Sequence, residues 1–258
     1  MNLHVRIVTP HTTARPSKLA GLEDLTGAFP GLRLSHVGLD AGPVSVEGSF
    51  DEALCAPGVV QRCIEAAREG VDQIVIDCMG DPGLEAARES VSTCVLGSCE
   101  TTLHVAAMLG HKFSVLTVLE RVRNLLERRA LVYGLRDKLA SVHAVDVPVL
   151  EIGVDEVALT RALFERAKVA IEQDHADTIV LGCTGFLGLS QRLSSALREA
   201  GYAVPVLDPL RTALATAVSL GSLGLTHSPQ AFPSASFGKP IRGFASLAQL
   251  LSQGAQRT

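Results

Sequence analysis

Two nine-residue segments of this chain, 72–80 and 177–185, share one sequence pattern. Each begins with Asp, continues through a run rich in Ile and Val, and ends on Cys-x-Gly. Such a run is typical of a strand buried on both faces of a parallel sheet, and the glycine allows a sharp turn just past it. The pattern therefore predicts that Cys78 and Cys183 stand at the carboxyl ends of two central strands, where open α/β sheets bind ligands.

The segments around this repeat alternate between expected strands and expected helices. Strands alternating with helices indicate an α/β protein with mainly parallel sheets and helical crossovers. The repeat divides the chain into two pseudo-symmetric lobes, each a sheet flanked by helices. We expect a first lobe of residues 1–118 completed by about 208–225, a second lobe of 119–207, and a tail of 226–258 without an assigned fold.

Local signals refine this expectation. The Gly- and Pro-containing stretch 40–49 predicts a loop, and Pro57 fits the first turn of the helix that follows. Asp81 precedes Pro82 in the way that an N-cap precedes the first helical residue, so it is expected to cap the helix at 83–90. Asp155 is expected to cap the next long helix of the second half.

The composition is that of a folded protein with a sizeable core. Hydrophobic residues make up 47% and charged residues 19% of the chain, so disorder is excluded. A net charge of −4 gives no support for a nucleic-acid surface. Apolar runs fall short of the ~20 residues that cross a bilayer, and no signal peptide precedes the first strand. We expect a cytoplasmic protein with reduced thiols and no membrane partner.

The cysteines differ in their expected roles. Cys55, Cys63 and Cys94 fall on apolar faces and are expected in the core, whereas Cys99 opens a helix, where a thiol pKa is lowered. Alternative roles for the repeated pair are a core position that the fold repeats, part of a zinc site, and a redox disulfide. Zinc usually needs four ligands and no histidine is adjacent, and the Cys-x-x-Cys spacing is missing. Their joint placement favours two thiols that face one substrate, one removing a proton and the other returning it.

Two further residues are expected at the same sheet edge. His11 follows the first strand and Thr117 ends another, so either side chain could bind a substrate oxygen. The plainer alternatives are an exposed loop histidine and an ordinary β-branched strand residue. The arginines at 121–129 indicate a solvated helix face or a subunit contact.

Three motifs resemble the hydantoin/allantoin racemase family of the aspartate/glutamate racemase superfamily. Residues 78–84 are similar to the family's Cys-Phe-Gly-Asp-Pro-Gly-Leu, residues 42–48 to its Gly-Pro-x-Ser-Ile-Glu-Gly loop, and residues 181–185 to its Gly-Cys-[Ala/Thr]-Gly. The chain departs at 9–13, which reads Thr-Pro-His-Thr-Thr where the family usually reads Asn-Pro-Asn-Thr-Ser, and at Met79, where the family has Phe.

The resemblance implies two α/β lobes with the active site in the cleft between them, and no cofactor or metal. It implies a racemase of 5-substituted hydantoins or a related ureide, with Cys78 and Cys183 as opposed acid and base. Alternatives on the same fold are an allantoin or amino-acid racemase and an arylmalonate decarboxylase or maleate isomerase; the non-enzyme alternative is a two-lobed small-molecule binding protein. We also expect a homo-oligomer. The expected substrate-binding residues are Pro10, His11, Thr12, Met79, Gly80, Thr117, Thr184 and Gly185.

Overall fold

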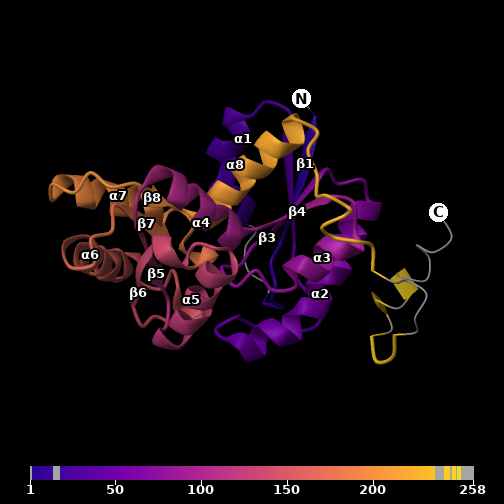
Figure 1. Ribbon diagram of the computed structural model, residues 1–258, viewed down its shortest axis with the longest axis horizontal. Coiled ribbons are helices and arrows are strands. Elements are labelled where there is room, and N and C mark those ends of the chain that lie inside the picture. Colours follow the sequence, from indigo (N-terminus) through magenta and orange to yellow (C-terminus); the bar gives the residue numbers. More distant parts are fainter. Residues whose placement is uncertain (1, 14–17, 236–240, 245, 248, 251–258) are drawn as a thin grey trace.

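The computed structural model has two α/β lobes that lie side by side (Figure 1). It describes residues 2–13, 18–235, 241–244, 246–247 and 249–250. Each lobe has a four-stranded sheet, in the orders β2-β1-β3-β4 and β6-β5-β7-β8, and every strand pair is parallel. The two repeated segments form β3 and β7, which lie at the same position in the two sheets, so the fold expected from the repeat is confirmed.

The first sheet has a hydrophobic core on each face. It consists of β1 (Leu3–Val8), β2 (Leu32–Val37), β3 (Gln73–Ile76) and β4 (Cys94–Gly97). One face packs against α2 (Ser49–Arg68) and α3 (Leu84–Ser90). The other face packs against the 3-10 helix η1 (Lys18–Leu22), α1 (Glu23–Ala28) and α8 (Pro209–Ser222). β3 is buried along its whole length, as the apolar run Ile74–Ile76 predicts, and the polar Gln73 is buried with it.

The second sheet is enclosed by one continuous core. Its strands are β5 (Phe113–Thr117), β6 (Leu139–Ala144), β7 (Thr178–Leu181) and β8 (Val206–Leu207). Its helices are α4 (Ser98–Leu109), α5 (Arg123–Val132), α6 (Glu156–Glu172) and α7 (Leu189–Glu199). Short 3-10 helices η2 (Glu120–Val122), η3 (Arg136–Lys138), η4 (Val149–Glu151) and η5 (Thr184–Phe186) join these elements.

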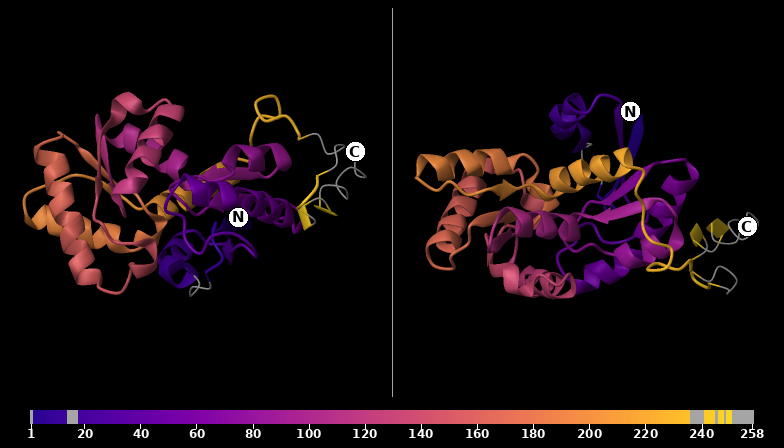
Figure 2. Two further views of the ribbon diagram at one scale, coloured as in Figure 1. Left: turned by 90° about the horizontal axis from the view of Figure 1, so that it is seen from below. Right: turned by 45° about the horizontal axis from the view of Figure 1, so that its top comes forward.

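The chain crosses between the lobes twice. After α4, β5 pairs with β6 and β7 of the second sheet, although residues up to 118 were expected in the first lobe. At the other end of the second lobe, α8 returns and packs on β1 and β3 (Figures 1 and 2). The first lobe is therefore completed by a distant segment, which places the two sheets close enough to share a site.

Three local expectations have different outcomes. Helix α2 begins at Ser49, so Pro57 lies inside the helix and not in its first turn as predicted. Asp81 does not cap the helix that follows it, because Gly83 occupies that N-cap position and no side chain caps α3. The Asp155 cap is confirmed, since its carboxylate accepts the Ala158 N–H at 2.9 Å.

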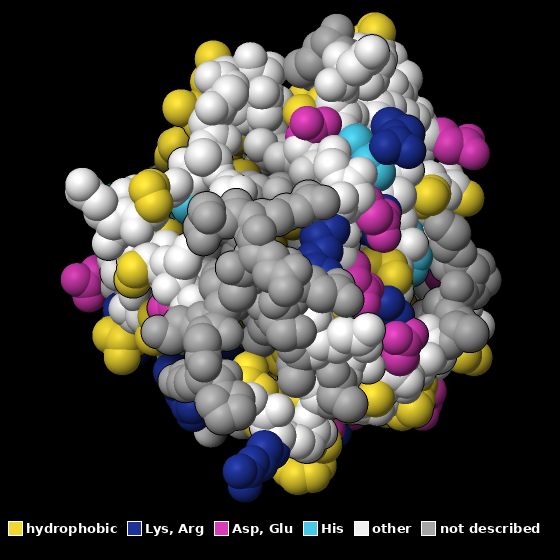
Figure 3. Space-filling view, turned by 90° about the vertical axis from the view of Figure 1, so that its right-hand side faces the viewer, with side chains coloured by type: hydrophobic (Ala, Val, Ile, Leu, Met, Phe, Trp, Pro, Cys, Tyr) yellow, Lys and Arg dark blue, Asp and Glu magenta, His cyan; other side chains and the backbone are white. Residues whose placement is uncertain are grey.

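The outer surface is mixed in charge. On the face of the first lobe that points away from the second lobe, the described acidic and basic side chains are interspersed (Figure 3). Among the described residues, no helix is both long and apolar enough to cross a membrane. In the tail, residues 246–247 and 249–250 are helical.

Candidate active site

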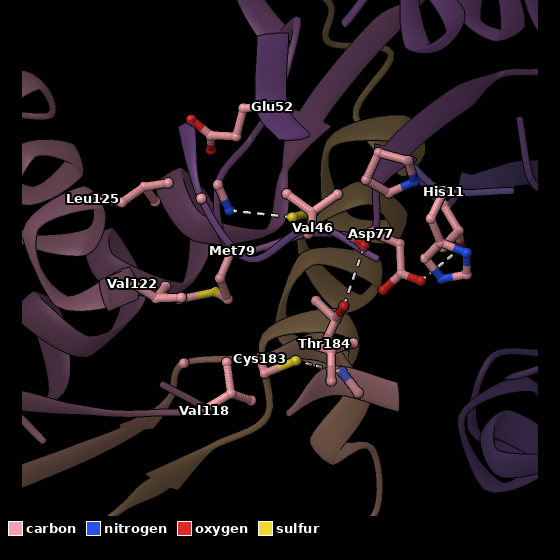
Figure 4. Close-up of a pocket in the computed structure, with 18 of the residues that line it drawn as sticks. His11, Val46, Glu52, Asp77, Met79, Val118, Val122, Leu125, Cys183 and Thr184 are labelled. Atoms are coloured by element: carbon pink, nitrogen blue, oxygen red, sulfur yellow. Dashed lines mark hydrogen bonds between the residues drawn. The ribbon is translucent and has the colours of Figure 1, made fainter. Parts of the chain in front are cut away.

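The two repeated cysteines have matching backbone surroundings. The Gly80 N–H donates to the Cys78 Sγ at 3.4 Å, and the Gly185 N–H donates to the Cys183 Sγ at 3.3 Å. Both thiols are half-buried, and both line one pocket between the lobes. The repeat therefore brings one sulfur from each lobe to one cavity (Figure 4).

The Cys78 thiol is in a low-polarity environment. Burial raises the pKa of Cys78 well above its usual value, the Gly80 N–H lowers it, and the negative charge of Glu52 raises it further. The helix that follows Cys78 begins only at Leu84, so this helix does not start at the cysteine. Burial and the charge of Glu52 therefore both disfavour the Cys78 thiolate relative to the thiol, the form that can donate a proton.

A polar cluster lines one side of the same pocket. The Lys18 Nζ lies 2.7 Å from the Asp77 Oδ2, and the Thr9 hydroxyl donates to that oxygen at 2.7 Å. Lys18 also reaches the second lobe, 3.2 Å from the Thr184 carbonyl oxygen. The Thr184 hydroxyl in turn donates to the Asp77 carbonyl at 3.1 Å. These contacts hold the ends of β3 and β7 against each other next to the cysteines.

A second acidic side chain lies on the opposite side of the pocket. Glu52 of α2 packs so closely over the turn after Cys78 that a Cβ on Gly80 would come within 1.9 Å of its Oε1. Burial raises the pKa of Glu52, while Arg129 of the second lobe, 3.4 Å away, lowers it. A side chain at position 80 would therefore displace the Glu52 carboxylate, the flexible end of that side chain, from its place over the turn.

The remaining wall is apolar. It faces the space between the sulfurs and comes from both lobes, so a substrate substituent could be enclosed there without losing hydrogen bonds. Figure 4 shows Met79, Val118, Val122 and Leu125 gathered on one side of the pocket, away from His11 and Asp77. The apolar side chains of this wall are Val46, Met79, Val118, Val122, Leu125 and Val149.

Most of the residues expected from the sequence lie together. The pocket is lined by both cysteines and by Pro10, His11, Met79, Gly80, Thr184 and Gly185. Thr12 does not line it, because its N–H and hydroxyl both bond to the Pro43 carbonyl. Thr117 is fully buried and also lies outside the lining, and Cys99 is fully buried with a thiol pKa raised well above its usual value by burial.

Sequence reasoning missed Lys18, Glu52 and Asp77, the charged residues of the pocket. Asp77 carried a usable signal, since it directly precedes Cys78 at the same sheet edge. Glu52 lies in the first turns of α2, a helix that was expected to begin later. Lys18 opens the short helix η1 and reaches the site only through the tertiary fold.

Two parallel-sheet lobes with a cysteine from each facing a shared pocket define a class of α/β enzymes that act within an interlobe cleft. Among the described residues, no group of three or more potential metal ligands occurs. The sequence profile of the Asp/Glu/Hydantoin racemase family matches residues 19–217, and the chain belongs to this family.

Relatives and solved structures agree with this assignment. The chain is 36% identical over 227 residues to a hydantoin racemase of Paenarthrobacter aurescens, covering 88% of this chain and 94% of that one. It is 34% identical over 224 residues to a hydantoin racemase of Pseudomonas sp., covering 86% and 87%. The allantoin racemase from Klebsiella pneumoniae superposes with a TM-score of 0.82 at 34% identity, covering 95% and 99%. The protein is an isomerase, a racemase of this family.

Proposed function

We propose that the protein racemises 5-substituted hydantoins or a related ureide without a cofactor, with Cys78 and Cys183 as opposed acid and base. The observation that carries this proposal is the matched pair of sulfurs, one from each lobe. Each sulfur accepts the N–H of the glycine two positions further along the chain, and both line one pocket. A thiolate on one side removes the proton from the ring carbon that bears the substituent. The thiol on the other side then delivers its own proton to the opposite face.

The substrate supplies much of the stabilisation that this chemistry needs. Removing the proton next to the ring carbonyl leaves an electron pair that delocalises onto the carbonyl oxygen. In the forward direction one cysteine gains a proton and the other loses one, so the proton count balances. Burial of Cys78 favours its thiol form at the start, which suits it to be the acid for one enantiomer. The two roles exchange for the other enantiomer.

The charges of the pocket favour an uncharged ring over an amino acid. The lining has two carboxylates, Asp77 and Glu52, against one ammonium group, Lys18. A dicarboxylate amino acid would add negative charge to a site that already has an excess of it. The apolar wall around Val122 and Leu125 suits an alkyl or aryl substituent at ring position 5. We therefore place a hydantoin with an apolar substituent first.

Allantoin is the second candidate substrate. Its ureido substituent is polar, and the observation that favours it is the likeness over nearly the whole chain to the Klebsiella pneumoniae allantoin racemase. His11, Lys18 and Thr184 offer polar contacts at one side of the pocket. In either case we propose that Pro10, His11, Gly80 and Gly185 contact the ring.

Polarimetry tests the proposal. Enantiopure 5-benzylhydantoin, 5-isobutylhydantoin, allantoin and aspartate are incubated with the protein after exhaustive chelation and without pyridoxal phosphate. Loss of optical rotation is expected first for the two hydantoins. Racemisation of aspartate alone would contradict the substrate assignment. Activity that is lost on chelation and restored by zinc would contradict the thiol-only chemistry.

A further inference from the structure

The internal symmetry of the pocket breaks at the residue before each catalytic cysteine. The first lobe has Asp77 at this position and the second has Gly182. A Cβ on Gly182 would lie 2.8 Å from the Val115 Cγ1 and 2.9 Å from the Leu116 carbonyl oxygen, so the second lobe has no room for a side chain. Only the first lobe therefore presents a carboxylate beside its cysteine.

One oxygen of this carboxylate is fully engaged and the other is not. The Asp77 Oδ2 accepts from the Thr9 hydroxyl and contacts the Lys18 ammonium, each at 2.7 Å. The Asp77 Oδ1 is buried and has no hydrogen-bond partner among the described residues. The side chain is 0% exposed, so bulk water does not satisfy this oxygen. An unsatisfied buried carboxylate oxygen is costly, and a bound N–H donor would remove that cost.

The surroundings of the Asp77 Oδ1 indicate where such a donor would come from. Asp77 lines the pocket together with Lys18 and both cysteines. Figure 4 shows its carboxylate between His11 and Thr184, on the side of the pocket away from the apolar wall. Lys18 has three N–H donors, and its contacts to Thr184 are long, 3.2 and 3.4 Å, so one donor can be turned to a ligand carbonyl.

We propose that Asp77 and Lys18 together anchor the ureide edge of the substrate ring. The Asp77 Oδ1 accepts a ring N–H, and the Lys18 ammonium donates to the adjacent ring carbonyl. The pair carries no net charge, so it recognises a neutral edge with neighbouring donor and acceptor in preference to a free carboxylate. Holding this edge fixes the ring between the two sulfurs. The inference rests on the proposed function and names the side chains that set its ring specificity.

A thermodynamic cycle that combines an enzyme variant with N-methylated substrate analogues tests this assignment. The ratio kcat/KM is measured for a 5-substituted hydantoin and its N1-methyl and N3-methyl analogues, with the wild type and with Asp77→Ala. Differences in acidity between the substrates cancel, because kcat/KM of every substrate is measured with both proteins. We expect methylation of one of the two nitrogens to cost the wild type about tenfold to a hundredfold more than it costs Asp77→Ala, as for a hydrogen bond to a charged group.

The matched control is Asp174→Ala. The Asp174 carboxylate also has a basic partner, since its Oδ2 lies 2.6 Å from the His143 Nε2. Asp174 precedes β7, so it lies at the opposite end of that strand from Cys183. For Asp174→Ala, N-methylation of the substrate should lower kcat/KM by the same factors as for the wild type. If Asp77→Ala fails to fold, as judged by circular dichroism, Asp77→Asn replaces it and should show a coupling of the same sign.

The outcomes separate this inference from the proposed function. A coupling within about twofold of unity for both analogues would mean that the Asp77 Oδ1 does not bond to the substrate ring, and it would overturn the anchor while leaving the racemase intact. A wild type that racemises none of these hydantoins would overturn the proposed function and the anchor together. A coupling of tenfold or more for either analogue, absent in Asp174→Ala, supports the anchor.

Discussion

Cys78 and Cys183 share a backbone contact but have different neighbours. The charge of Glu52, packed over the turn after β3, disfavours the Cys78 thiolate, and burial disfavours it more strongly. Cys183 is the N-cap residue of the 3-10 helix η5 and lies beside Thr184, which bonds across to the first lobe. The two thiols therefore match in their N–H contact and differ in the residues around them, which makes their surroundings unequal.

This inequality predicts a pH profile for Cys78 alone. Alkylation requires the thiolate, so labelling of Cys78 by iodoacetamide should be slow at neutral pH and rise with pH beyond the usual thiol pKa of 9.0. Glu52→Gln removes a nearby negative charge and should shift the profile to lower pH. Glu156→Gln, at the exposed Arg192 ion pair, should not shift it. Peptide mass spectrometry measures the labelling, and full labelling of wild-type Cys78 at neutral pH would contradict this account.

At the scale of elements, the turn between β3 and α3 depends on Asp81. The Asp81 carboxylate accepts the Cys99 N–H at 2.9 Å and the Glu100 N–H at 2.8 Å, so it caps α4. It also accepts the Tyr133 hydroxyl of the second lobe at 2.7 Å. Its backbone has a φ of 46°, a left-handed value that the surrounding contacts must stabilise. This residue thereby links the turn after Cys78 to α4 and to the second lobe.

Asp81→Asn should lower the free energy of unfolding by about 1–3 kcal/mol, because an amide cannot accept all three hydrogen bonds. Burial raises the pKa of Asp81 from 3.8 to about 6. Between these values the native state keeps a proton that the unfolded state has lost, so the wild type loses stability as pH rises. Urea unfolding should show the free energy of unfolding of the wild type falling by up to about 3 kcal/mol from about pH 4 to 6, a fall that the variant lacks. A difference between wild type and variant that grows with pH would refute this.

The sequence predicted the elements that have periodic or buried apolar patterns. Both central strands and the cysteines at their ends lie where the sequence placed them. Two expectations that depended on partners distant in the chain were wrong, the cap formed by Asp81 and the lobe of β5. Asp81 follows the usual capping pattern for α3, yet it caps α4, because the partners that decide its role lie 18 and 19 positions further on. Tertiary packing likewise decides which sheet β5 joins. The periodicity of a strand's sequence carries no information about that choice.

At the scale of the whole molecule, polar contacts join the lobes around the pocket. The Val149 N–H donates to the Glu47 Oε1 at 3.0 Å, and Glu47 also pairs with Arg121. Glu52 pairs with Arg129 at 3.4 Å. Both glutamates come from the first lobe, and all three partners come from the second. These contacts, with those of Asp81 and Thr184, hold the two lobes together around the pocket that both cysteines line.

The expected homo-oligomer stays a prediction at this scale. Large apolar side chains remain exposed near the lobe junction, among them Phe50 at 75% and Leu131 at 61%. Such side chains are often covered in an assembly. Light scattering after size-exclusion chromatography should give a multiple of the 27.2 kDa chain mass. Phe50→Ser should lower that mass, whereas a wild-type mass of one chain at all concentrations would contradict the expectation.

The two-thiol mechanism is tested most directly by proton exchange in D₂O with Cys78→Ser and Cys183→Ser, each supplied with either pure enantiomer of a 5-substituted hydantoin. A serine hydroxyl is too weak a base to replace a thiolate, so each variant should lose racemisation by at least about 10²-fold. Each should still exchange the substrate's ring proton for deuterium in one enantiomer only, and the two variants should exchange opposite enantiomers. Cys94→Ala, in the core of the first lobe, should racemise both enantiomers as the wild type does. Near-normal racemisation by either serine variant, or exchange of the same enantiomer by both, would contradict the mechanism.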